Sequence, residues 1–172
     1  MNKAVESWKS KLKQIDTFIF DIDGVITDGK VYTLPDNQLA RTIYTKDGLA
    51  LKYAAGKGYR IAVISGGNAE GIRDRLQYLN IKDVFLKSDD KLPVLLQYMK
   101  ENNLSPEQIA YMGDDIFDIP VLDYVGLSAA PANAAREVLE RVDFVTPQNG
   151  GEGCVRELIE QVLRVRGDWF DL

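Results

Sequence analysis

Short apolar runs alternate with longer amphipathic segments along most of the chain. The apolar runs are rich in Ile, Val, Phe and Met and predict buried strands at 17–20, 60–64, 84–86, 109–112, 126–130 and 143–146. The segments between them carry apolar residues at helical spacing and predict helices at 4–14, 47–56, 68–78, 90–102, 133–141 and 154–165. We expect Asn68 to cap the third of these helices, and Asp89 or Asp90 the fourth.

A different pattern separates the first strand from the second. Two β-rich runs at 30–34 and 39–44 flank the turn residues Pro35-Asp36-Asn37-Gln38, which predicts a hairpin. Elsewhere strands and helices alternate with very short loops, which is typical of a doubly wound α/β fold with a parallel sheet. We find no internal repeat and no low-complexity linker, so we expect one domain over 1–172, with the hairpin at about 30–44 as an insertion and a short tail at 167–172.

Composition excludes several classes of function. The net charge of −5 and the pI near 4.8 argue against nucleic acid as a partner. No apolar run approaches the roughly 20 residues that span a membrane, and the mixed, charged residues 1–13 do not read as a signal peptide. Cys154 is the single cysteine, which excludes an intramolecular disulfide and a cysteine zinc cluster. We therefore expect a cytoplasmic protein.

The sequence contains no histidine, which narrows the chemistry further. Ser-His and Cys-His nucleophile pairs and His-ligated metal sites are excluded. An enzyme built from this chain would have to use carboxylates and lysine, and its metal would be a hard cation that prefers oxygen ligands.

Two carboxylates, Asp21 and Asp23, follow the first strand directly and precede Gly24. Side chains alternate with period two along a strand, so both should leave its carboxyl end on the same side. Two like charges at this spacing need a cation or a shared proton, and the carboxyl ends of strands in open α/β sheets are where ligands bind. A plain Asp-rich turn would also explain the segment, whereas a calcium loop would need its glycine at the sixth position, where Ile26 stands.

Three further polar elements follow later strands: Ser65, Lys91 and the pair Asp114-Asp115, with Asp118 on the next helix. Taken singly, each has a structural explanation as a turn, a cap or a solvated side chain. Together, at one edge of a parallel sheet, they supply a carboxylate nucleophile, a second carboxylate for proton transfer, a hydroxyl and an ammonium for anionic oxygens, and a metal-binding acid. That set predicts a phosphoryl-transfer site.

The order Asp-x-Asp-Gly, Ser-Gly, Lys, Gly-Asp-Asp-x-x-Asp resembles the haloacid dehalogenase superfamily of phosphatases from about Asp16 to Leu163. The resemblance implies that Asp21 is the nucleophile and forms an aspartyl-phosphate, and that Asp23 is the general acid and base. It implies that Ser65 and Lys91 hold the phosphoryl oxygens, with Lys87 as a rival for the lysine. Asp21, the backbone carbonyl of Asp23, and Asp114 would bind Mg²⁺, supported by Asp115 and Asp118.

The gaps between these motifs are too short for a cap domain. A capless member with a hairpin after Asp-Gly-Val-Ile-Thr-Asp-Gly resembles the 3-deoxy-D-manno-octulosonate 8-phosphate phosphatases, as do Thr45-Lys46-Asp47-Gly48, the Gly150-Gly151-Glu152-Gly153 turn and Arg156-Glu157. That resemblance implies a phosphorylated sugar-acid substrate and a homotetramer. It also implies that the substrate is bound by Asp23, Tyr44, Thr45, Lys46, Asp47, Gly48, Lys52, Gly66, Arg75 and Lys91.

The apolar hairpin residues Val31, Leu39 and Ile43 and the tail aromatics Trp169 and Phe170 lead us to expect that a neighbour completes each site through its hairpin and its tail. A monomer whose hairpin folds back on its own sheet is the alternative.

Alternatives remain at this point. Gly67 stands where many octulosonate phosphatases carry Arg, so the phosphatase for 2-keto-3-deoxynononate 9-phosphate, which has the same architecture, is a second candidate. From another class, a phospho-acceptor signalling domain uses a similar sheet, acidic cluster, hydroxyl and lysine, but carries its acceptor on a later strand and needs no second acid. A non-catalytic scaffold would leave the four aligned polar elements unexplained.

Overall fold

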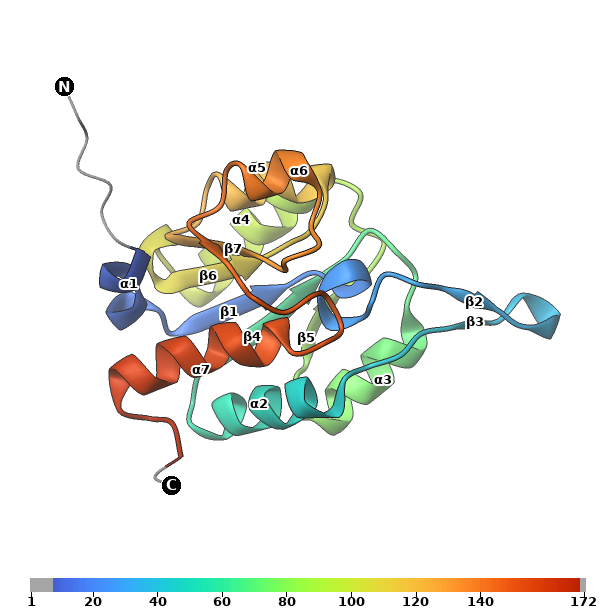
Figure 1. Cartoon of the computed structure of the whole chain (residues 1–172), viewed down its shortest axis with the longest axis horizontal. Helices are drawn as coiled ribbons and strands as arrows, with labels where there is room; N and C mark the ends of the chain where they lie inside the picture. The colour runs from blue at the N-terminus through green and yellow to red at the C-terminus, as the bar shows by residue number, and fades with distance from the viewer. Residues whose placement is uncertain (1–7, 171–172) are drawn as a thin grey trace.

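The computed structural model describes residues 8–170, and its centre is a six-stranded parallel sheet in the order β5-β4-β1-β6-β7-β8 (Figure 1). Its strands are β1 (Thr17–Phe20), β4 (Arg60–Ile64), β5 (Asp83–Phe85), β6 (Ile109–Met112), β7 (Leu127–Ala130) and β8 (Phe144–Val145). All six predicted strands are therefore present. Phe20 pairs with Val63 on one side and with Met112 on the other, which makes β1 a central strand.

Helices cover both faces of the sheet, as the doubly wound fold requires (Figure 1). One face carries α2 (Thr45–Gly56), α3 (Glu70–Tyr78) and α7 (Cys154–Arg166), and the other carries α4 (Lys91–Asn102), α5 (Ile119–Leu122) and α6 (Arg136–Leu139). The alternation of side chains along β1 divides the core accordingly, because Phe18 and Phe20 belong to the first cluster and Ile19 to the second. The predicted α/β class is confirmed.

The chain enters the sheet through α1 (Trp8–Lys11) and the 3₁₀ turn Leu12–Gln14, which fall inside the helix predicted at 4–14; its first residues lie outside the described part. Shorter helical turns at Ile22–Ile26, Pro35–Asn37, Pro106–Gln108 and Ile116–Asp118 connect the main elements. Among the described residues no helix has the length and apolar character needed to cross a bilayer.

The structure contains the predicted hairpin, but its two strands are shorter than predicted. β2 (Tyr32–Thr33) pairs antiparallel with β3 (Leu39–Ala40), and it projects away from the sheet (Figure 1). The strand predicted to run to Tyr44 ends at Ala40, because Arg41 turns inward and Ile43 packs against the core. Nothing that could serve as a cap domain lies in the described segments between Asp23 and Ser65 or between Lys91 and Gly113.

The start of α3 differs from the prediction, and the start of α4 matches it in position only. Ala69, not Asn68, occupies the N-cap of α3, and no side chain caps it. Asp90 occupies the N-cap position of α4, but its carboxylate makes no capping hydrogen bond.

The helix predicted at 133–141 is confined to Arg136–Leu139, because Pro131 opens the preceding segment with a turn.

The described end of the chain is packed. Trp169 is buried, and both Trp169 and Phe170 contact the ring of Tyr53 on α2 at centroid distances of 5.6 and 3.7 Å. The side chain of Asp168 accepts a hydrogen bond from Tyr59 at 2.6 Å. The tail aromatics thus belong to the core of this chain as far as residue 170.

Candidate active site

The three central strands deliver three candidate residues to one edge of the sheet. Backbone hydrogen bonds extend the ladder beyond the strand ends: the Asp21 amide donates to Met112 at 3.0 Å, the Ser65 amide to Phe85 at 2.9 Å, and the Gly113 amide to Ala129 at 3.2 Å. These bonds fix Asp21, Ser65 and the following Asp114 at neighbouring positions. Asp21, Ser65 and Asp114 therefore lie together at the carboxyl edge of the sheet.

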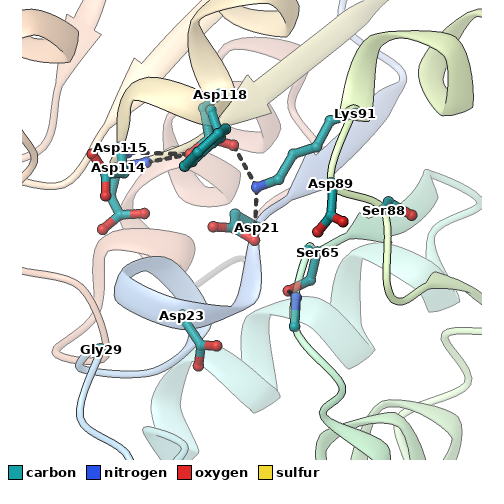
Figure 2. A pocket seen from close by; sticks show the side chains of 13 residues that line it. Asp21, Asp23, Gly29, Ser65, Ser88, Asp89, Lys91, Asp114, Asp115 and Asp118 are labelled. Atoms are coloured by element: carbon teal, nitrogen blue, oxygen red, sulfur yellow. Dashed lines mark hydrogen bonds and ion pairs between the residues drawn. The ribbon is translucent and has the colours of Figure 1, made fainter.

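A cavity of about 400 Å³ lies at this edge (Figure 2). Eight of the residues singled out from the sequence line it: Asp21, Asp23, Ser65, Gly66, Lys91, Asp114, Asp115 and Asp118. Gly29, Gly67, Ser88, Asp89 and Phe117 complete the lining. The cavity therefore joins the loops that follow four strands, β1, β4, β5 and β6.

Lys91 is buried between two carboxylates. Its Nζ lies 3.0 Å from Oδ1 of Asp21 and 2.7 Å from Oδ1 of Asp118. Burial alone would lower the pKa of Lys91, but the charges of Asp21 and Asp118 raise it above its ordinary value. Lys91 is therefore a permanent cation of the site, whereas the rival Lys87 is exposed and does not line the cavity.

Asp118 is held from all sides. Its Oδ1 accepts hydrogen bonds from Lys91 and from the buried Tyr111 hydroxyl, at 2.7 and 2.5 Å. Its Oδ2 accepts from the amides of Asp114 and Asp115, at 3.0 and 3.2 Å. These four bonds use the acceptor capacity of the carboxylate, so Asp118 is suited to orienting its neighbours.

Asp21 and Asp114 carry the unbalanced charge of the site. Burial raises the pKa of Asp21 to about 7, reinforced by the charge of Asp118 and opposed by Lys91. Burial also raises the pKa of Asp114 to about 7, reinforced by Asp21, Asp118 and Asp115. Repulsion of this kind indicates a place for a cation.

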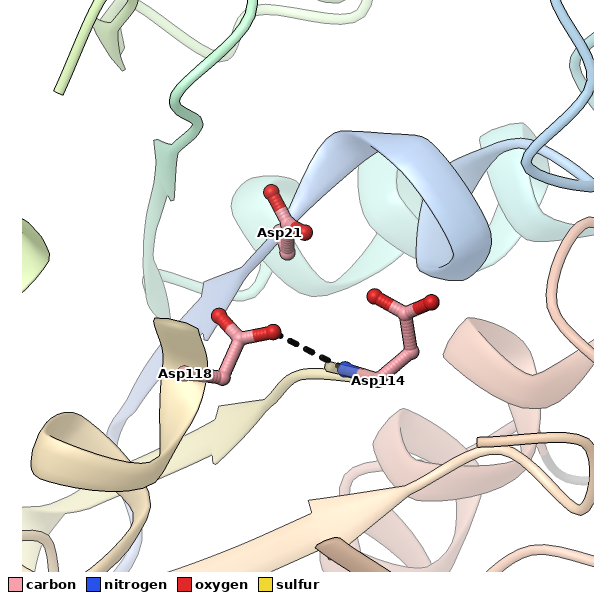
Figure 3. Close-up of side chains that lie close together, drawn as sticks. All are labelled: Asp21, Asp114 and Asp118. Atoms are coloured by element: carbon pink, nitrogen blue, oxygen red, sulfur yellow. Dashed lines mark hydrogen bonds between the residues drawn. The ribbon is translucent and has the colours of Figure 1, made fainter. Parts of the chain in front are cut away.

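The donor set fits a divalent metal. Asp21, Asp114 and Asp118 each present a carboxylate oxygen within 4.8 Å of the others (Figure 3). Oδ1 of Asp114 is buried without a hydrogen-bond partner, and an added Cβ at Gly24 would lie 2.0 Å from Oδ2 of the same carboxylate. Gly24 has a φ of +85°, so its backbone also favours glycine. Because Asp118 is already fully bonded, Asp21 and Asp114 are the carboxylates that would hold the ion, and oxygen ligands suit Mg²⁺.

The second carboxylate of the motif, Asp23, is oriented differently. Figure 2 shows its side chain turned away from the Asp21–Asp114–Asp118 cluster, on the side of the cavity where Ser65 lies. Its oxygens accept hydrogen bonds from the guanidinium of Arg41 at 2.6 and 3.1 Å. Asp23 is thus a cavity residue whose carboxylate is free of the acidic cluster.

Ser65 is buried, and its Oγ accepts a hydrogen bond from the Gly67 amide at 3.3 Å. Its hydroxyl proton can therefore point into the cavity. On the opposite rim Asp115 caps the turn Ile116–Asp118 by accepting from the Ile116 amide at 2.7 Å, which places it in a supporting position.

The other predicted substrate-binding residues lie outside the cavity. Asp47 is buried and accepts a hydrogen bond from the Arg156 amide of α7 at 2.8 Å, with burial raising its pKa to about 6. Lys52 and Arg75 flank the ring of Tyr78, at 5.7 and 5.1 Å from its centroid. The remaining predicted substrate-binding residues lie at the start of α2, also outside the cavity: Tyr44, Thr45, Lys46 and Gly48.

Three side chains of the cavity, and Arg41 beside it, were not predicted from the sequence. Ser88 and Asp89 follow a predicted strand, so the strand-end rule that found Ser65 could have included them. Phe117, which is 73% exposed at the rim, and Arg41, which comes from the end of the hairpin, had no such signal.

Comparison with known proteins agrees with this geometry. Residues 82–158 match the model of the haloacid dehalogenase-like hydrolase family. The 3-deoxy-D-manno-octulosonate 8-phosphate phosphatase of Escherichia coli K12 is 33% identical over 158 residues, covering 92% of this chain and 84% of the relative.

Two solved structures are similar over nearly the whole fold. The 3-deoxy-D-manno-octulosonate 8-phosphate phosphatase of Yersinia pestis superimposes with a TM-score of 0.92 at 31% identity, covering 95% of this chain and 88% of the other. That of Moraxella catarrhalis, in complex with magnesium, phosphate and the sugar acid, gives a TM-score of 0.88 at 29% identity, covering 91% and 90%. The chain belongs to the haloacid dehalogenase superfamily, in the family of 3-deoxy-D-manno-octulosonate 8-phosphate phosphatases.

Proposed function

We propose that this phosphatase hydrolyses 3-deoxy-D-manno-octulosonate 8-phosphate to the sugar acid and phosphate through an aspartyl-phosphate on Asp21. The observation that carries the proposal is the juxtaposition, in one cavity, of Asp21, Asp23, Ser65, Lys91 and Asp114. The Moraxella catarrhalis relative, which holds magnesium, phosphate and the sugar acid, supports the choice of substrate and of Mg²⁺ as cofactor.

In the first half of the proposed reaction, an oxygen of Asp21 attacks the phosphorus and the bond from phosphorus to the sugar oxygen breaks. Asp23 donates its proton to the leaving alkoxide. In the second half, the Asp23 carboxylate takes a proton from a water molecule, whose oxygen attacks the same phosphorus. The bond from phosphorus to Asp21 breaks, phosphate leaves, and both carboxyl groups return to their starting state.

The other residues of the cavity would orient and balance charge. Lys91 holds Asp21 in place and offers positive charge to the phosphoryl oxygens, and the Ser65 hydroxyl donates to one of them. Mg²⁺, held by Asp21, Asp114 and the carbonyl of Asp23, supplies positive charge at the phosphoryl group when bound. Asp118 and Asp115 keep these ligands in position.

The hairpin supports a homotetramer with shared sites. Val31, Tyr32, Leu34 and Leu39 are each between 42% and 52% exposed, which is a concentrated apolar surface on a hairpin of two-residue strands. A second chain that covers it would bring new groups to the open cavity. In this proposal the residues at 44–48, Lys52 and Arg75 meet the sugar-acid end of the substrate in the assembly.

A nine-carbon substrate, 2-keto-3-deoxynononate 9-phosphate, is the second candidate. Gly67 motivates it, because the loop after β4 carries no side chain where many octulosonate phosphatases carry Arg. The space beside Gly67 is limited: an added Cβ would lie 3.3 Å from Oδ2 of Asp23.

Phosphate release from a panel of phosphorylated sugars and sugar acids, with Mg²⁺ present, tests the proposal. We expect the highest kcat/KM with 3-deoxy-D-manno-octulosonate 8-phosphate. A higher value for the nononate would select the second candidate. Equal values for neutral sugar phosphates would contradict a sugar-acid substrate altogether.

A further inference from the structure

Arg41 forms a two-pronged ion pair with Asp23. Its Nε lies 2.6 Å from Oδ1 and its Nη2 lies 3.1 Å from Oδ2 of the carboxylate. The Arg41 side chain is only 7% exposed, whereas that of Asp23 is 34% exposed. The guanidinium is therefore shielded from solvent, while the carboxylate keeps access to the cavity.

This geometry fixes the direction of the carboxylate. Two parallel N–H···O bonds define the plane of both groups, which a single hydrogen bond or a lysine would not do. The only other side chain with a hydrogen bond to Asp23 in the described part is Thr27, at a long 3.4 Å. Asp23 lies in the turn Ile22–Ile26 with non-helical backbone angles, so without Arg41 only the long bond from Thr27 would orient its carboxylate.

The arrangement also joins three separate segments. Asp23 follows β1, Arg41 follows β3 of the hairpin, and Gly67 lies in the loop after β4. An added Cβ at Gly67 would meet Oδ2 of Asp23 at 3.3 Å and Nη2 of Arg41 at 3.8 Å, so the bare glycine leaves room for the ion pair. A displacement of the hairpin would thus move the Asp23 carboxylate through the side chain of Arg41.

We propose that Arg41 is a positioning residue, which holds the Asp23 carboxylate in the direction needed to protonate the leaving group. This rests on the proposed acid role of Asp23. Arg41 itself touches neither Asp21 nor the acidic cluster, and it does not line the cavity. Its effect should therefore appear only where a proton transfer from Asp23 limits the rate.

The leaving group provides the test. Departure of a sugar alkoxide needs a proton, whereas departure of p-nitrophenolate does not, so the two substrates separate a positioning role from a structural one. kcat and KM are measured with Mg²⁺ for the wild type, Arg41→Ala and Arg41→Lys, on 3-deoxy-D-manno-octulosonate 8-phosphate and on p-nitrophenyl phosphate. Arg136→Ala serves as a control, because Arg136 pairs with Glu140 on the exposed surface.

For Arg41→Ala we expect kcat and kcat/KM on the sugar phosphate to fall together, by about 10- to 100-fold. On p-nitrophenyl phosphate kcat/KM should change by less than about threefold, since its leaving group needs no proton. Arg41→Lys should recover part of the loss. Wild-type protein that hydrolyses neither substrate would refute the proposed function itself, separately from this role.

Three results would overturn the positioning role. Equal losses on both substrates would make Arg41 a structural residue. A rise in KM confined to the sugar acid, with kcat unchanged, would make it a direct ligand of the substrate. Wild-type kinetics on both substrates would show that Asp23 is oriented without it.

Discussion

The ammonium nitrogen of Lys91 lies 3.0 Å from the Asp21 carboxylate, and the two side chains are only 5% and 9% exposed. Among the described residues, Lys91 is the one cation that lines the cavity, against six aspartates. Its removal would leave a buried cluster of negative charges without its counterion, so stability and turnover should both depend on it.

Lys91→Met should therefore lower kcat by about 100-fold or more and the free energy of unfolding by about 2–4 kcal/mol. Phosphate release and urea unfolding measure the two effects. Lys87→Met is the matched control, because Lys87 is exposed outside the cavity. Full activity in Lys91→Met would remove the lysine from the mechanism.

Asp21→Asn should abolish turnover and stabilise the metal-free protein at neutral pH. Burial and the charge of Asp118 raise the pKa of Asp21 from 3.8 to about 7, so the folded protein binds a proton more tightly than the unfolded chain between these values. The stability of the wild type should fall as the pH rises through that window. Asparagine cannot ionise, so the variant should lose less stability there, by about 1–3 kcal/mol.

Urea unfolding in a chelator, at about pH 4 and at about pH 8, checks this expectation. Asp123→Asn, on an exposed carboxylate, is the control. If the free energies of unfolding of Asp21→Asn and wild type differ equally at both pH values, ionisation of Asp21 does not destabilise the fold.

Removing Mg²⁺ should stop turnover, and Ca²⁺ should not restore it. Both ions accept oxygen ligands, but Mg²⁺ imposes the tighter octahedral geometry. Mg²⁺ should also raise the thermal midpoint of the wild type, and Asp114→Asn should abolish this rise, because the unpartnered Oδ1 of Asp114 is a proposed ligand. Full activity after exhaustive chelation would contradict the metal role.

Tyr111→Phe should reduce kcat by about 5- to 20-fold with little change in KM, since Tyr111 acts on the site only by fixing Asp118. Loss of this buried hydrogen bond should cost about 1 kcal/mol of stability. Tyr98→Phe is the control: its hydroxyl pairs with Asp83, which lies outside the cavity. If both variants lose activity equally, Tyr111 has no special link to the site.

The double variant Val31→Asp, Leu39→Asp should dissociate the proposed tetramer and reduce activity on the sugar acid. These side chains are 42% and 51% exposed on the hairpin, and charge there opposes burial against another chain. Val165→Asp, on a similarly exposed residue of α7, should change neither property. Sedimentation measures the assembly. A monomeric wild type with full activity would refute shared sites.

Strand-end residues of this fold could be predicted from sequence because one rule places them. Asp21, Ser65 and Asp114 each follow an apolar run, and parallel strands bring their carboxyl ends to one edge. The length of the helix predicted at 133–141 was overestimated, because a turn that begins at Pro131 occupies the residues before Arg136. Asn68 is not the cap, because α3 begins one residue later, with Ala69 in the N-cap position and no capping side chain.

Arg41 shows what such a rule cannot supply. The position of Arg41 depends on how the chain returns from the hairpin to the sheet, and the pattern of apolar and polar residues does not predict that path. The same holds for the residues at the start of α2: Asp47 turned out to bond the amide of Arg156 on α7, a contact between segments 109 positions apart. Side chains that meet through tertiary docking have no local signature.

The central place of β1 has a consequence for how the enzyme would lose activity on denaturation. Asp21, Ser65 and Asp114 follow three adjacent inner strands, while the sheet edges β5 and β8 contain only three and two residues. Hydrogen exchange should be slowest in β1, β4 and β6, and fraying of β8 should leave the cavity intact. Fraying of β5 should lower activity before global unfolding, because the loop after β5 supplies Ser88 and Asp89 to the cavity.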